Sequence, residues 1–447
     1  MATDVIHDGL ADGAPTRPST NERVFRQLLV NTLVTGVTST FVWFALTFWV
    51  YLETRSVVAT GVIGGAFSLC SAFIGPAFGT FVDRHLKHTS MVLATSVSGA
   101  SFVLATVVFV AVDARDILRL AGPWFWVLVA LTLLGSVAGT MRNVALSTCV
   151  TLLVPEERRD RANGMVGMVT GVSFAITSVF SGIVIGQLGM GWALYLAVAL
   201  TLVALVHLLP IRIPEAAPEP VAEGSARIDV RGAMEAIRAV PGLSMLILLA
   251  AFNNLLGGVF MALMDAYGLS LVSVETWGFL WGFLSMGFIA GGLIVAKVGL
   301  GTMPARVIIL GNLLNWVVCA LFTLRSSVVM LTIGCFVWIL MIPIIEAAEQ
   351  TVLQRSIPFE RQGRVFGFAQ MVENAAAPLT AFMIGPIAET VFMPFMTDGS
   401  GADAIGGWFG TGPERGIALV FTVAGLIGVV VTLLARASHS YRRLTTA

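Results

Sequence analysis

Apolar residues in this chain form long, nearly uninterrupted stretches that are separated by short polar loops. A helix needs about 20 mostly apolar residues to cross the hydrocarbon core of a bilayer. Twelve segments reach this length. They lie near 27–51, 57–82, 89–112, 123–145, 164–188 and 190–209, and then near 242–265, 277–298, 304–324, 327–350, 364–391 and 414–436. The pattern predicts an all-α membrane protein with twelve transmembrane helices.

A polar gap at residues 210–240 divides the predicted spans into two groups of six. It contains Pro210, Pro214, Pro218 and Pro220, and residues 229–239 have the pattern of a short amphipathic helix at the membrane surface. We expect an N-terminal bundle over 27–209, a cytoplasmic linker over 210–240 and a C-terminal bundle over 241–437. The tails are 1–26 and 438–447, and the first 26 residues do not have the pattern of a signal peptide.

The composition supports lipid as the surrounding solvent. Of the 447 residues, 57% are hydrophobic and 12% are charged, whereas soluble domains are about a quarter charged. The zero net charge argues against nucleic acid as a partner. The four cysteines lie in apolar stretches without metal-ligand spacing, and neither a Walker A loop nor a catalytic cluster occurs. We therefore expect no metal, no cofactor and no enzymatic activity.

Basic loop residues indicate the orientation, because positively charged loops are retained in the cytoplasm. With the N-terminus inside, the Lys and Arg outside the spans fall mostly on the cytoplasmic side. The outer side then holds Arg55, Arg115, Arg119, Arg325 and Arg415. We predict that both termini face the cytoplasm and that the protein is a multi-pass component of the inner (cytoplasmic) membrane.

The two halves resemble each other in sequence. A shift of 203 positions places residues 154–161 on residues 357–364, where a Pro, a Glu and two Arg coincide. In the same register Gly164 falls on Gly367, and Gly182 falls on Gly385. Both segments follow the fourth span of their half. Since each half has an even number of spans, this repeat is a parallel one.

The loop between spans two and three reads Gly79-Thr80-Phe81-Val82-Asp83-Arg84-His85-Leu86-Lys87. It resembles the G-x-x-x-D-R-x-G-R/K loop of the major facilitator superfamily, except that Leu86 stands where the family usually has Gly. The spans, the linker and the repeat agree with that family over essentially the whole chain. The resemblance implies two pseudo-symmetric six-helix bundles and transport by alternating access.

A finer resemblance concerns the loops that follow the fourth span of each half. Residues 153–164, Leu-Val-Pro-Glu-Glu leading to Arg-Ala-Asn-Gly, look like the corresponding loop of the macrolide-efflux and enterobactin-exporter branch, and so do residues 356–367. That branch consists largely of proton-driven exporters. Span five, however, lacks the Gly-Pro pair of the better-known drug antiporters.

Alternating access requires cytoplasmic contacts that form in one state and separate in the other. Asp83 ends span two, and the N-terminus of span eleven, near Arg364, carries a partial positive charge. A contact between them would close the cytoplasmic side. We therefore take Gly79, Asp83, Arg84 and Lys87 as candidate gating residues. Arg84 and Lys87 could bind acids on neighbouring loops or lipid phosphates. The alternative is that these two residues only fix the topology.

Glu373 lies about ten residues into span eleven, at lipid depth. An ionisable group there is costly and is a functional candidate by default. Because the loss of hydration disfavours the anion, this carboxyl can exchange a proton or meet a cationic substrate. The alternative is a structural hydrogen bond to a neighbouring helix.

Glu346 and Glu349 lie one helical turn apart on span ten, and Arg142 lies at similar depth on span four. The pseudo-twofold relation would place these spans in corresponding positions. We predict a cytoplasmic latch between Arg142 and Glu346. An Arg that extends to the headgroups accounts for Arg142 equally well.

Amides, aromatic residues and Met within the spans are candidates for lining a substrate cavity. Helix packing through the amides and lipid contact of the rings are the alternatives. The candidates are Asn253, Asn254, Asn374, Trp43, Phe44, Trp338 and Met341.

Together these features predict a secondary active transporter, a monomer surrounded by membrane lipids, that exports an amphiphilic drug-like molecule in exchange for protons. Siderophore export and lipid or lysolipid translocation are alternatives on the same fold. A membrane enzyme would need a polar catalytic cluster, and a receptor would need a large soluble domain. The sequence has neither.

Overall fold

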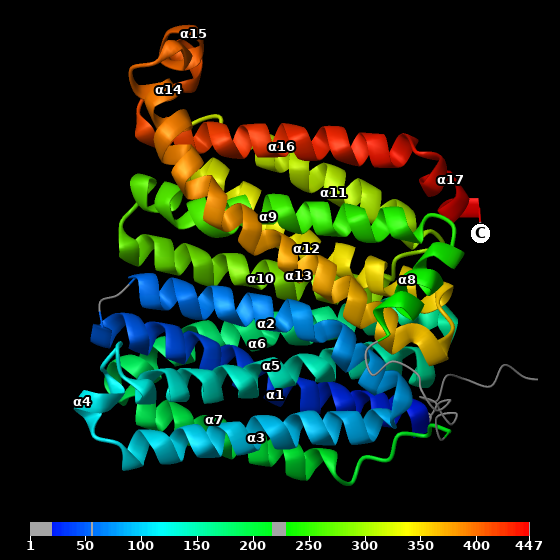
Figure 1. Ribbon diagram of the computed structural model, residues 1–447. Helices are drawn as coiled ribbons and strands as arrows, with labels where there is room; N and C mark the ends of the chain where they lie inside the picture. The colour runs from blue at the N-terminus through cyan, green and yellow to red at the C-terminus, as the bar shows by residue number, and fades with distance from the viewer. Residues whose placement is uncertain (1–19, 55–56, 217–228, 447) are drawn as a thin grey trace, which may run out of the picture.

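The computed structural model describes residues 20–54, 57–216 and 229–446, and these residues form helices and connecting loops without a strand. Long helices run side by side in two groups, one from each half of the chain (Figure 1). The N-terminal group consists of α1 (Thr20–Thr54), α2 (Val57–Arg84), α3 (Lys87–Ala111), α5 (Pro123–Leu153), α6 (Arg159–Gln187) and α7 (Gly189–Leu208). The C-terminal group consists of α9 (Leu243–Leu271), α10 (Val274–Val298), α11 (Pro304–Leu321), α12 (Val328–Ser356), α13 (Phe359–Ile387) and α16 (Pro413–Ala437).

Eleven of the described helices are long and apolar enough to cross a membrane. The remaining long helix, α6, has 29 residues and packs against α1 and α10. It completes the first bundle. The predicted fold class, twelve transmembrane helices in two six-helix bundles, is confirmed.

Short helices occupy the connections. They are α4 (Ala114–Ile117), the 3-10 turn η1 (Glu156–Arg158), α8 (Val230–Ala239) in the linker and α17 (His439–Thr446) at the C-terminus. The helix α8 forms where the sequence predicts an amphipathic helix, and the Asp229 carboxylate caps it by accepting from the N–H of Gly232. The first helix begins at Thr20, inside the predicted tail, and residues 1–19 of that tail lie outside the described residues.

The segment between α13 and α16 is largely helical, and the hydropathy pattern predicts nothing for most of it. A π-helical stretch η2 (Ala388–Phe392), α14 (Met393–Thr397) and α15 (Ser400–Phe409) project sideways at the end of the bundle opposite the C-terminus (Figure 1). Arg415 anchors this segment. Its buried guanidinium donates to the carbonyl oxygens of Thr323 (2.9 Å) and Leu324 (3.0 Å) and lies over the ring of Phe409 at 4.2 Å.

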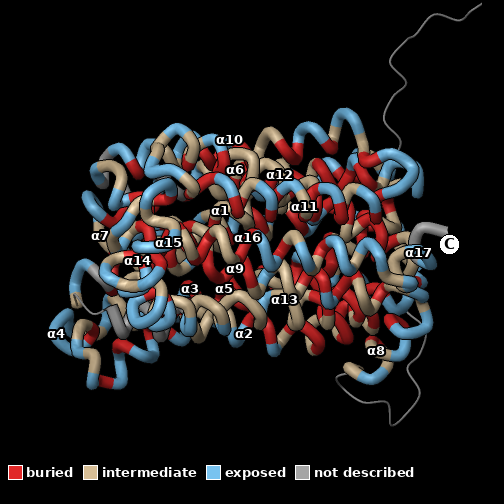
Figure 2. The backbone as a smooth tube through the Cα atoms, turned by 90° about the horizontal axis from the view of Figure 1, so that it is seen from above, coloured by how far each residue is buried: buried red, intermediate tan, exposed pale blue. Residues whose placement is uncertain are grey.

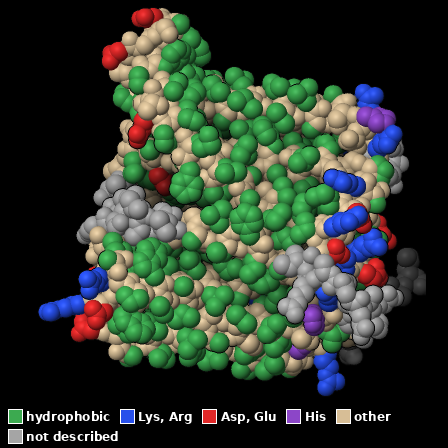
Figure 3. All heavy atoms as spheres, viewed as in Figure 1, with side chains coloured by type: hydrophobic (Ala, Val, Ile, Leu, Met, Phe, Trp, Pro, Cys, Tyr) green, Lys and Arg blue, Asp and Glu red, His purple; other side chains and the backbone are tan. Residues whose placement is uncertain are grey.

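Hydrophobic side chains cover the sides of the bundle, and charged side chains gather at its two ends (Figure 3). Lys and Arg are concentrated at the end that carries α8, α17 and the start of α1. By the positive-inside rule this is the cytoplasmic end, so both termini face the cytoplasm. Of the outer basic residues predicted from the sequence, Arg55 lies outside the described residues.

Two helix pairs make the most extensive contacts between the halves, α2 with α13 and α6 with α10. They pack closely because glycines lie in the contact. A Cβ at Gly79 of α2 would meet the carbonyl oxygen of Gly363 and the Cα of Arg364. On the other pair, a Cβ at Gly292 of α10 would meet the backbone of Met168. Small residues let membrane helices approach in this way.

Buried side chains follow the inner faces of the helices (Figure 2). At the cytoplasmic end they form one apolar cluster that includes Val82 and Ala162 of the N-terminal half with Val295 and Val365 of the C-terminal half. Toward the outer end the core divides into two clusters, one in each half. The protein is therefore closed at its cytoplasmic end.

Candidate functional site

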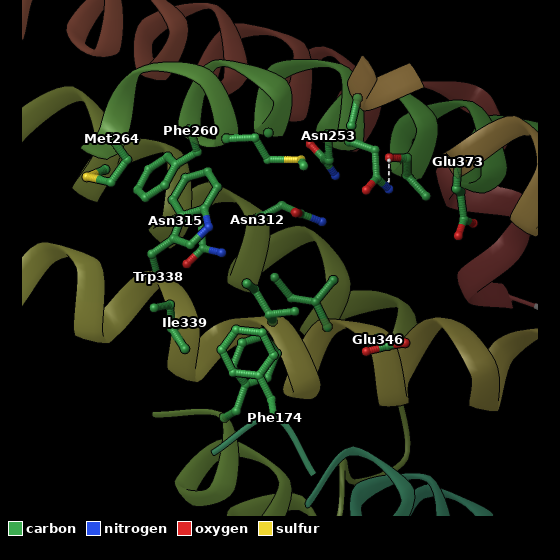
Figure 4. Close-up of a pocket in the computed structure, with 18 of the residues that line it drawn as sticks. Phe174, Asn253, Phe260, Met264, Asn312, Asn315, Trp338, Ile339, Glu346 and Glu373 are labelled. Carbon is green, nitrogen blue, oxygen red and sulfur yellow. Dashed lines mark hydrogen bonds between the residues drawn. The ribbon is translucent and has the colours of Figure 1, made fainter. Parts of the chain in front are cut away.

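A cavity of about 740 Å³ lies in the middle of the bundle, mostly within the C-terminal half. Its described walls come from α9, α10, α11, α12 and α13, and the N-terminal half contributes Phe44 of α1 and Phe174 of α6 (Figure 4). It extends from Asp265 and Trp281, near the outer ends of their helices, to Glu349 near the cytoplasmic side. A cavity at this depth between two bundles is where transporters of inverted or parallel repeats bind substrate.

Three carboxyls lie at the cytoplasmic end of the cavity. Glu346 and Glu349 come from one face of α12, and Glu373 comes from α13 across the cavity from Glu346 (Figure 4). Asn374 lines the wall beside Glu373. The described lining residues include no Lys, Arg or His. This end of the cavity therefore favours protons or an organic cation, because a low-dielectric wall strengthens the attraction between opposite charges.

Aromatic rings cover the walls further toward the outer side. Phe260 stacks on Trp338 with 4.6 Å between ring centroids, and Trp316 meets Trp338 edge-on at 4.9 Å. At the outer end the Asp265 carboxylate accepts from the indole N–H of Trp277 (2.9 Å) and of Trp281 (3.1 Å). These rings offer a large apolar surface with few rotatable bonds, as in many small-molecule sites.

Asp83 closes one of the two contacts between the halves at the cytoplasmic end. Its Oδ1 accepts from the backbone N–H of Gly363 (2.6 Å), and its Oδ2 accepts from the backbone N–H (2.9 Å) and the Nε–H (2.9 Å) of Arg364. The carboxylate thus binds the fifth and sixth residues of α13, near the N-terminal end of the helix, where the helix dipole favours an anion. This is the contact that the sequence predicts for Asp83.

Asp160 forms the matching contact between α6 and α10. Its Oδ2 accepts from the backbone N–H of Leu300 (2.7 Å), just beyond the end of α10, and Oδ1 accepts from the N–H of Arg161. The shift of 203 residues places Asp160 on Gly363, which is the donor in the other contact. The two contacts therefore lie at corresponding places in the two halves, but their directions differ. In the first, α13 donates to Asp83 at the end of α2, and in the second, Asp160 of α6 accepts from Leu300 just beyond α10.

A cluster of amides lies between these two contacts. Asn163 of α6 donates to the hydroxyl of Thr351 and to Oε1 of Gln354, both at 2.9 Å, and Gln354 donates to the carbonyl oxygen of Ser147 at 3.0 Å. All three bonds join the N-terminal half to α12. They add to the closure of the cytoplasmic end.

The linker also contacts both halves. Asp229 Oδ2 accepts from Nη1 of Arg364 (2.6 Å), and the backbone N–H of Asp229 donates to the hydroxyl of Thr80 on α2 (3.1 Å). Earlier in the linker, the Glu215 carboxylate accepts from the backbone N–H groups of Lys87 (2.9 Å) and His88 (3.1 Å) at the start of α3. The linker is thereby held across the contact that Asp83 forms.

The predicted latch between Arg142 and Glu346 is not formed. Arg142 is buried inside the N-terminal half, where its guanidinium donates to the hydroxyl of Thr95 (2.7 Å) and to Oδ1 of Asn31 (2.5 Å). Glu346 instead lines the cavity. The sequence gives the depth of Arg142 along α5 but not its direction around the helix, and the guanidinium does not extend to the headgroups either.

Several other predicted residues lie elsewhere than expected. Lys87 is buried, donates to the carbonyl oxygen of Val82 (3.0 Å) and lies 5.0 Å from the ring centre of Phe359, so it does not face lipid phosphates. Trp43 packs on Phe67 of α2 at 4.6 Å rather than on the cavity. Met341 packs against the cytoplasmic core.

The remaining candidates lie on or beside the sites described above. Arg84 is half-buried at the end of α2. The predicted cavity residues found among the lining residues are Asn253, Asn254, Asn374, Phe44 and Trp338.

The family model described as Major Facilitator Superfamily matches residues 28–381. The chain belongs to this superfamily. It is therefore a membrane transporter and not an enzyme.

Individual relatives of this major facilitator protein are distant. It is 20% identical to macrolide efflux protein A of Streptococcus pyogenes over 371 residues, which cover 80% of this chain and 87% of the relative. Its fold is similar to that of the human organic anion transporter MFSD10 (TETRAN), with a TM-score of 0.68, 12% identity and coverage of 93% and 100% of the two chains. The fold is also similar to that of a bacterial homologue of the iron transporter ferroportin in its outward-facing state, with a TM-score of 0.69, 14% identity and coverage of 93% and 100% of the two chains.

Sequence reasoning about this transporter missed Asp160, Asn163 and Gln354 in the closure, and Asn312 and Asn315 in the cavity. A signal was present for some of them. Asp160 and Asn163 lie in the segment that repeats in the second half, and Asn312 and Asn315 are spaced for one face of a helix. The sequence carried no comparable signal for Gln354.

Proposed function

We propose that the protein is a proton-coupled exporter in the cytoplasmic membrane that carries amphiphilic organic cations by alternating access. The observation that carries this proposal is the placement of Glu346, Glu349 and Glu373 at one end of a cavity with aromatic walls. Carboxyls in such a place can bind protons or a cationic substrate, and competition between the two is sufficient for exchange. The aromatic walls offer the apolar surface for the rest of the molecule.

The closure at the cytoplasmic end supports transport by alternating access. Asp83 and Asp160 hold the two halves together in this state, and a return to the inward-open state must break both contacts. Export then follows if the substrate binds from the cytoplasm while the acids are deprotonated and leaves toward the outside when they bind protons. The relative named macrolide efflux protein A makes macrolides a first class of compounds to test.

The lining argues against the siderophore alternative, since an anionic siderophore would meet four carboxyls and no basic residue among the described lining side chains. A lysolipid with a cationic headgroup remains compatible with the cavity. It belongs in the same screen as drug-like cations.

The test is a transport assay in proteoliposomes with and without an imposed pH gradient, screened over macrolides, other amphiphilic cations, siderophores and lysolipids. We expect wild-type protein to move amphiphilic cations against their gradient only when the pH gradient is present. Glu373→Gln should lower the rate of proton-driven transport at least a hundredfold while substrate still binds. Glu389→Gln, which changes an exposed acid of η2 outside the cavity, is the matched control and should transport as wild type does.

Full proton-driven transport by Glu373→Gln would remove this residue from the coupling mechanism. Transport that does not respond to the pH gradient in wild-type protein would contradict proton coupling itself.

A further inference from the structure

The part of the chain between α13 and α16 forms an arm at the outer end of the bundle. This outer arm consists of η2, α14 and α15, residues 388–409. Helix α13 runs into η2 and α14 without a break, so that Phe359–Thr397 is one helical run of 39 residues. A helix of that size is about 58 Å long, whereas the hydrocarbon core of a bilayer is about 30 Å thick. The excess must leave the membrane or turn along its surface.

The outer arm turns along the surface. In Figure 1 it extends sideways from the bundle, level with the outer ends of α9 and α10 and not beyond them. The ends of spanning helices lie at the lipid headgroups. An arm at this level therefore lies beside the outer leaflet and not in bulk water.

Exposed apolar side chains form one stripe along this helical run. Its members recur at every fourth residue, which is the spacing of one helix face. They are Leu379 and Met383 in α13, Ile387 at the end of α13, Val391 in η2 and Phe395 in α14, and their exposed fractions range from 36% to 62%. The stripe is continuous from the lipid-facing side of the span to the arm, so lipid that covers its first part can also cover the rest.

Packing against the bundle holds the outer arm in this position. Met396 and Phe409 are buried, and the ring of Phe409 lies under the guanidinium of Arg415. The backbone N–H of Gly412 donates to the carbonyl oxygen of Met396 at 2.9 Å. Trp408 remains 55% exposed on α15. The arm is thus a fixed element of the fold that leaves the stripe and one indole ring to an outside partner.

The charges of the outer arm are all negative. Glu389, Asp398 and Asp403 are exposed, and residues 388–409 contain no Lys, Arg or His. In Figure 3 acidic side chains lie on the outer side and the tip of the arm, and hydrophobic side chains cover the side turned toward the bundle. A helical segment with one apolar and one charged side lies in the plane of the membrane interface. Its carboxylates repel anionic headgroups and attract the positive group of zwitterionic ones.

We propose that the outer arm binds the outer leaflet of the membrane and favours zwitterionic over anionic lipids. The apolar stripe and Trp408 lie below the headgroups, and the three acids lie among them. The arm thereby anchors the outer end of α13, the helix that carries Glu373. A second copy of the chain is the other candidate to cover the stripe, but the like charges of two arms disfavour it.

The test is the depth of nitroxide labels on the full-length protein in lipid nanodiscs. Collisions of each label with oxygen, which dissolves in lipid, and with a nickel complex, which stays in water, report the depth. Labels are attached to single introduced cysteines in a Cys70→Ser background, because Cys70 is exposed and the other three native cysteines are buried.

In discs of phosphatidylethanolamine and phosphatidylcholine, we expect the labels of Val391→Cys, Phe395→Cys and Trp408→Cys to lie about 5–10 Å into the interface. The label of Asp403→Cys is the matched control on the polar side of the arm and should collide with the nickel complex. In phosphatidylglycerol discs the first three labels should become shallower, and added salt should restore their depth. The label of Met383→Cys within the span should keep its depth in both lipids.

Nickel collisions of the Val391, Phe395 and Trp408 labels that match those of the Asp403 label would place the arm in water and overturn the proposal. Shielding of the three labels from both reagents, together with dipolar broadening between copies, would assign the stripe to a second copy and also overturn it. Equal depths in the two kinds of lipid would overturn the preference for zwitterionic headgroups.

Discussion

The N-terminal half encloses Arg142 among neutral partners, whereas the C-terminal half places Glu346, Glu349 and Glu373 on the wall of the cavity. Both halves have six long helices and a common sequence register. In the first, the interior charge is satisfied by Asn31 and Thr95 of the same bundle. In the second, the interior charges face the cavity and are left for a mobile partner.

This difference indicates how the two halves of a duplicated protein can take different roles in transport. An interior charge that is bonded within its own bundle ties helices together, and we expect it to keep its partners through the transport cycle. Carboxyls that face a cavity must change partners as the cavity changes, and a proton or a cation is the natural partner. We therefore propose that the N-terminal half is the fixed support and that the C-terminal half binds the substrate.

The most direct test of the different roles of the two halves is to neutralise the interior charges of each half in turn. We expect the triple change Glu346→Gln, Glu349→Gln and Glu373→Gln to weaken binding of octyltrimethylammonium by at least about 4 kcal/mol, roughly a thousandfold. Arg142→Met should leave this affinity within about twofold and lower the stability by about 2 kcal/mol, because Thr95 and Asn31 lose a charged donor. Calorimetry and thermal unfolding report the two quantities. A large loss of affinity in Arg142→Met would contradict the assigned roles.

The close packing of α2 on α13 gives the next largest expected effect. In Gly79→Ala the added methyl meets the backbone at Gly363, which cannot move aside as a flexible side chain would. We expect the cytoplasm-closed state to lose about 3 kcal/mol, roughly a hundredfold in population. Distances between spin labels at the cytoplasmic ends of α3 and α11 report the shift. Gly186→Ala is the control, because a Cβ there meets nothing within 4 Å.

The two aspartate contacts sharpen the comparison at the cytoplasmic end. Asp83 accepts three bonds from the other half, and Asp160 accepts one. Asp83→Asn should therefore cost the closed state about 2 kcal/mol, roughly thirtyfold in population, and Asp160→Asn about 1 kcal/mol, roughly fivefold. The spin-label distances that report on Gly79 measure both. Substrate binding should persist in each variant; a loss of binding with normal opening and closing would place Asp83 outside the gate.

The smallest expected effect concerns the linker. The Asp229–Arg364 pair is partly exposed to water, and such pairs contribute little. Asp229→Asn should shift the population toward the inward-open state by about 0.5 kcal/mol, roughly twofold. Arg231→Gln, which removes a fully surface pair with Glu235 on the same helix, should have no effect on the distances. Equal effects of the two changes would show that α8 does not support the gate.

Much of the site could be predicted from residue chemistry at lipid depth. Glu373, Asn253 and Asn254 stood out because polar groups are rare in apolar spans, and all three line the cavity. Asp83 stood out through its loop. The predictions for Arg142, Trp43 and Met341 went astray for a common reason: depth along a span is legible in hydropathy, but the direction of a side chain depends on how the helix is rotated in the bundle.

Taken alone, the amino-acid sequence determined the number of spans, the orientation in the membrane, the division into two related halves and the family. These follow from local apolar length, the placement of basic loops and a repeated register, none of which needs knowledge of packing. Only the tertiary structure decided that Asp160 mirrors Asp83, that Arg142 turns inward to Asn31, and that the acids of α12 and α13 share one cavity. These are contacts between helices far apart in the chain, and they depend on helix rotation and close approach at glycine, which hydropathy does not encode.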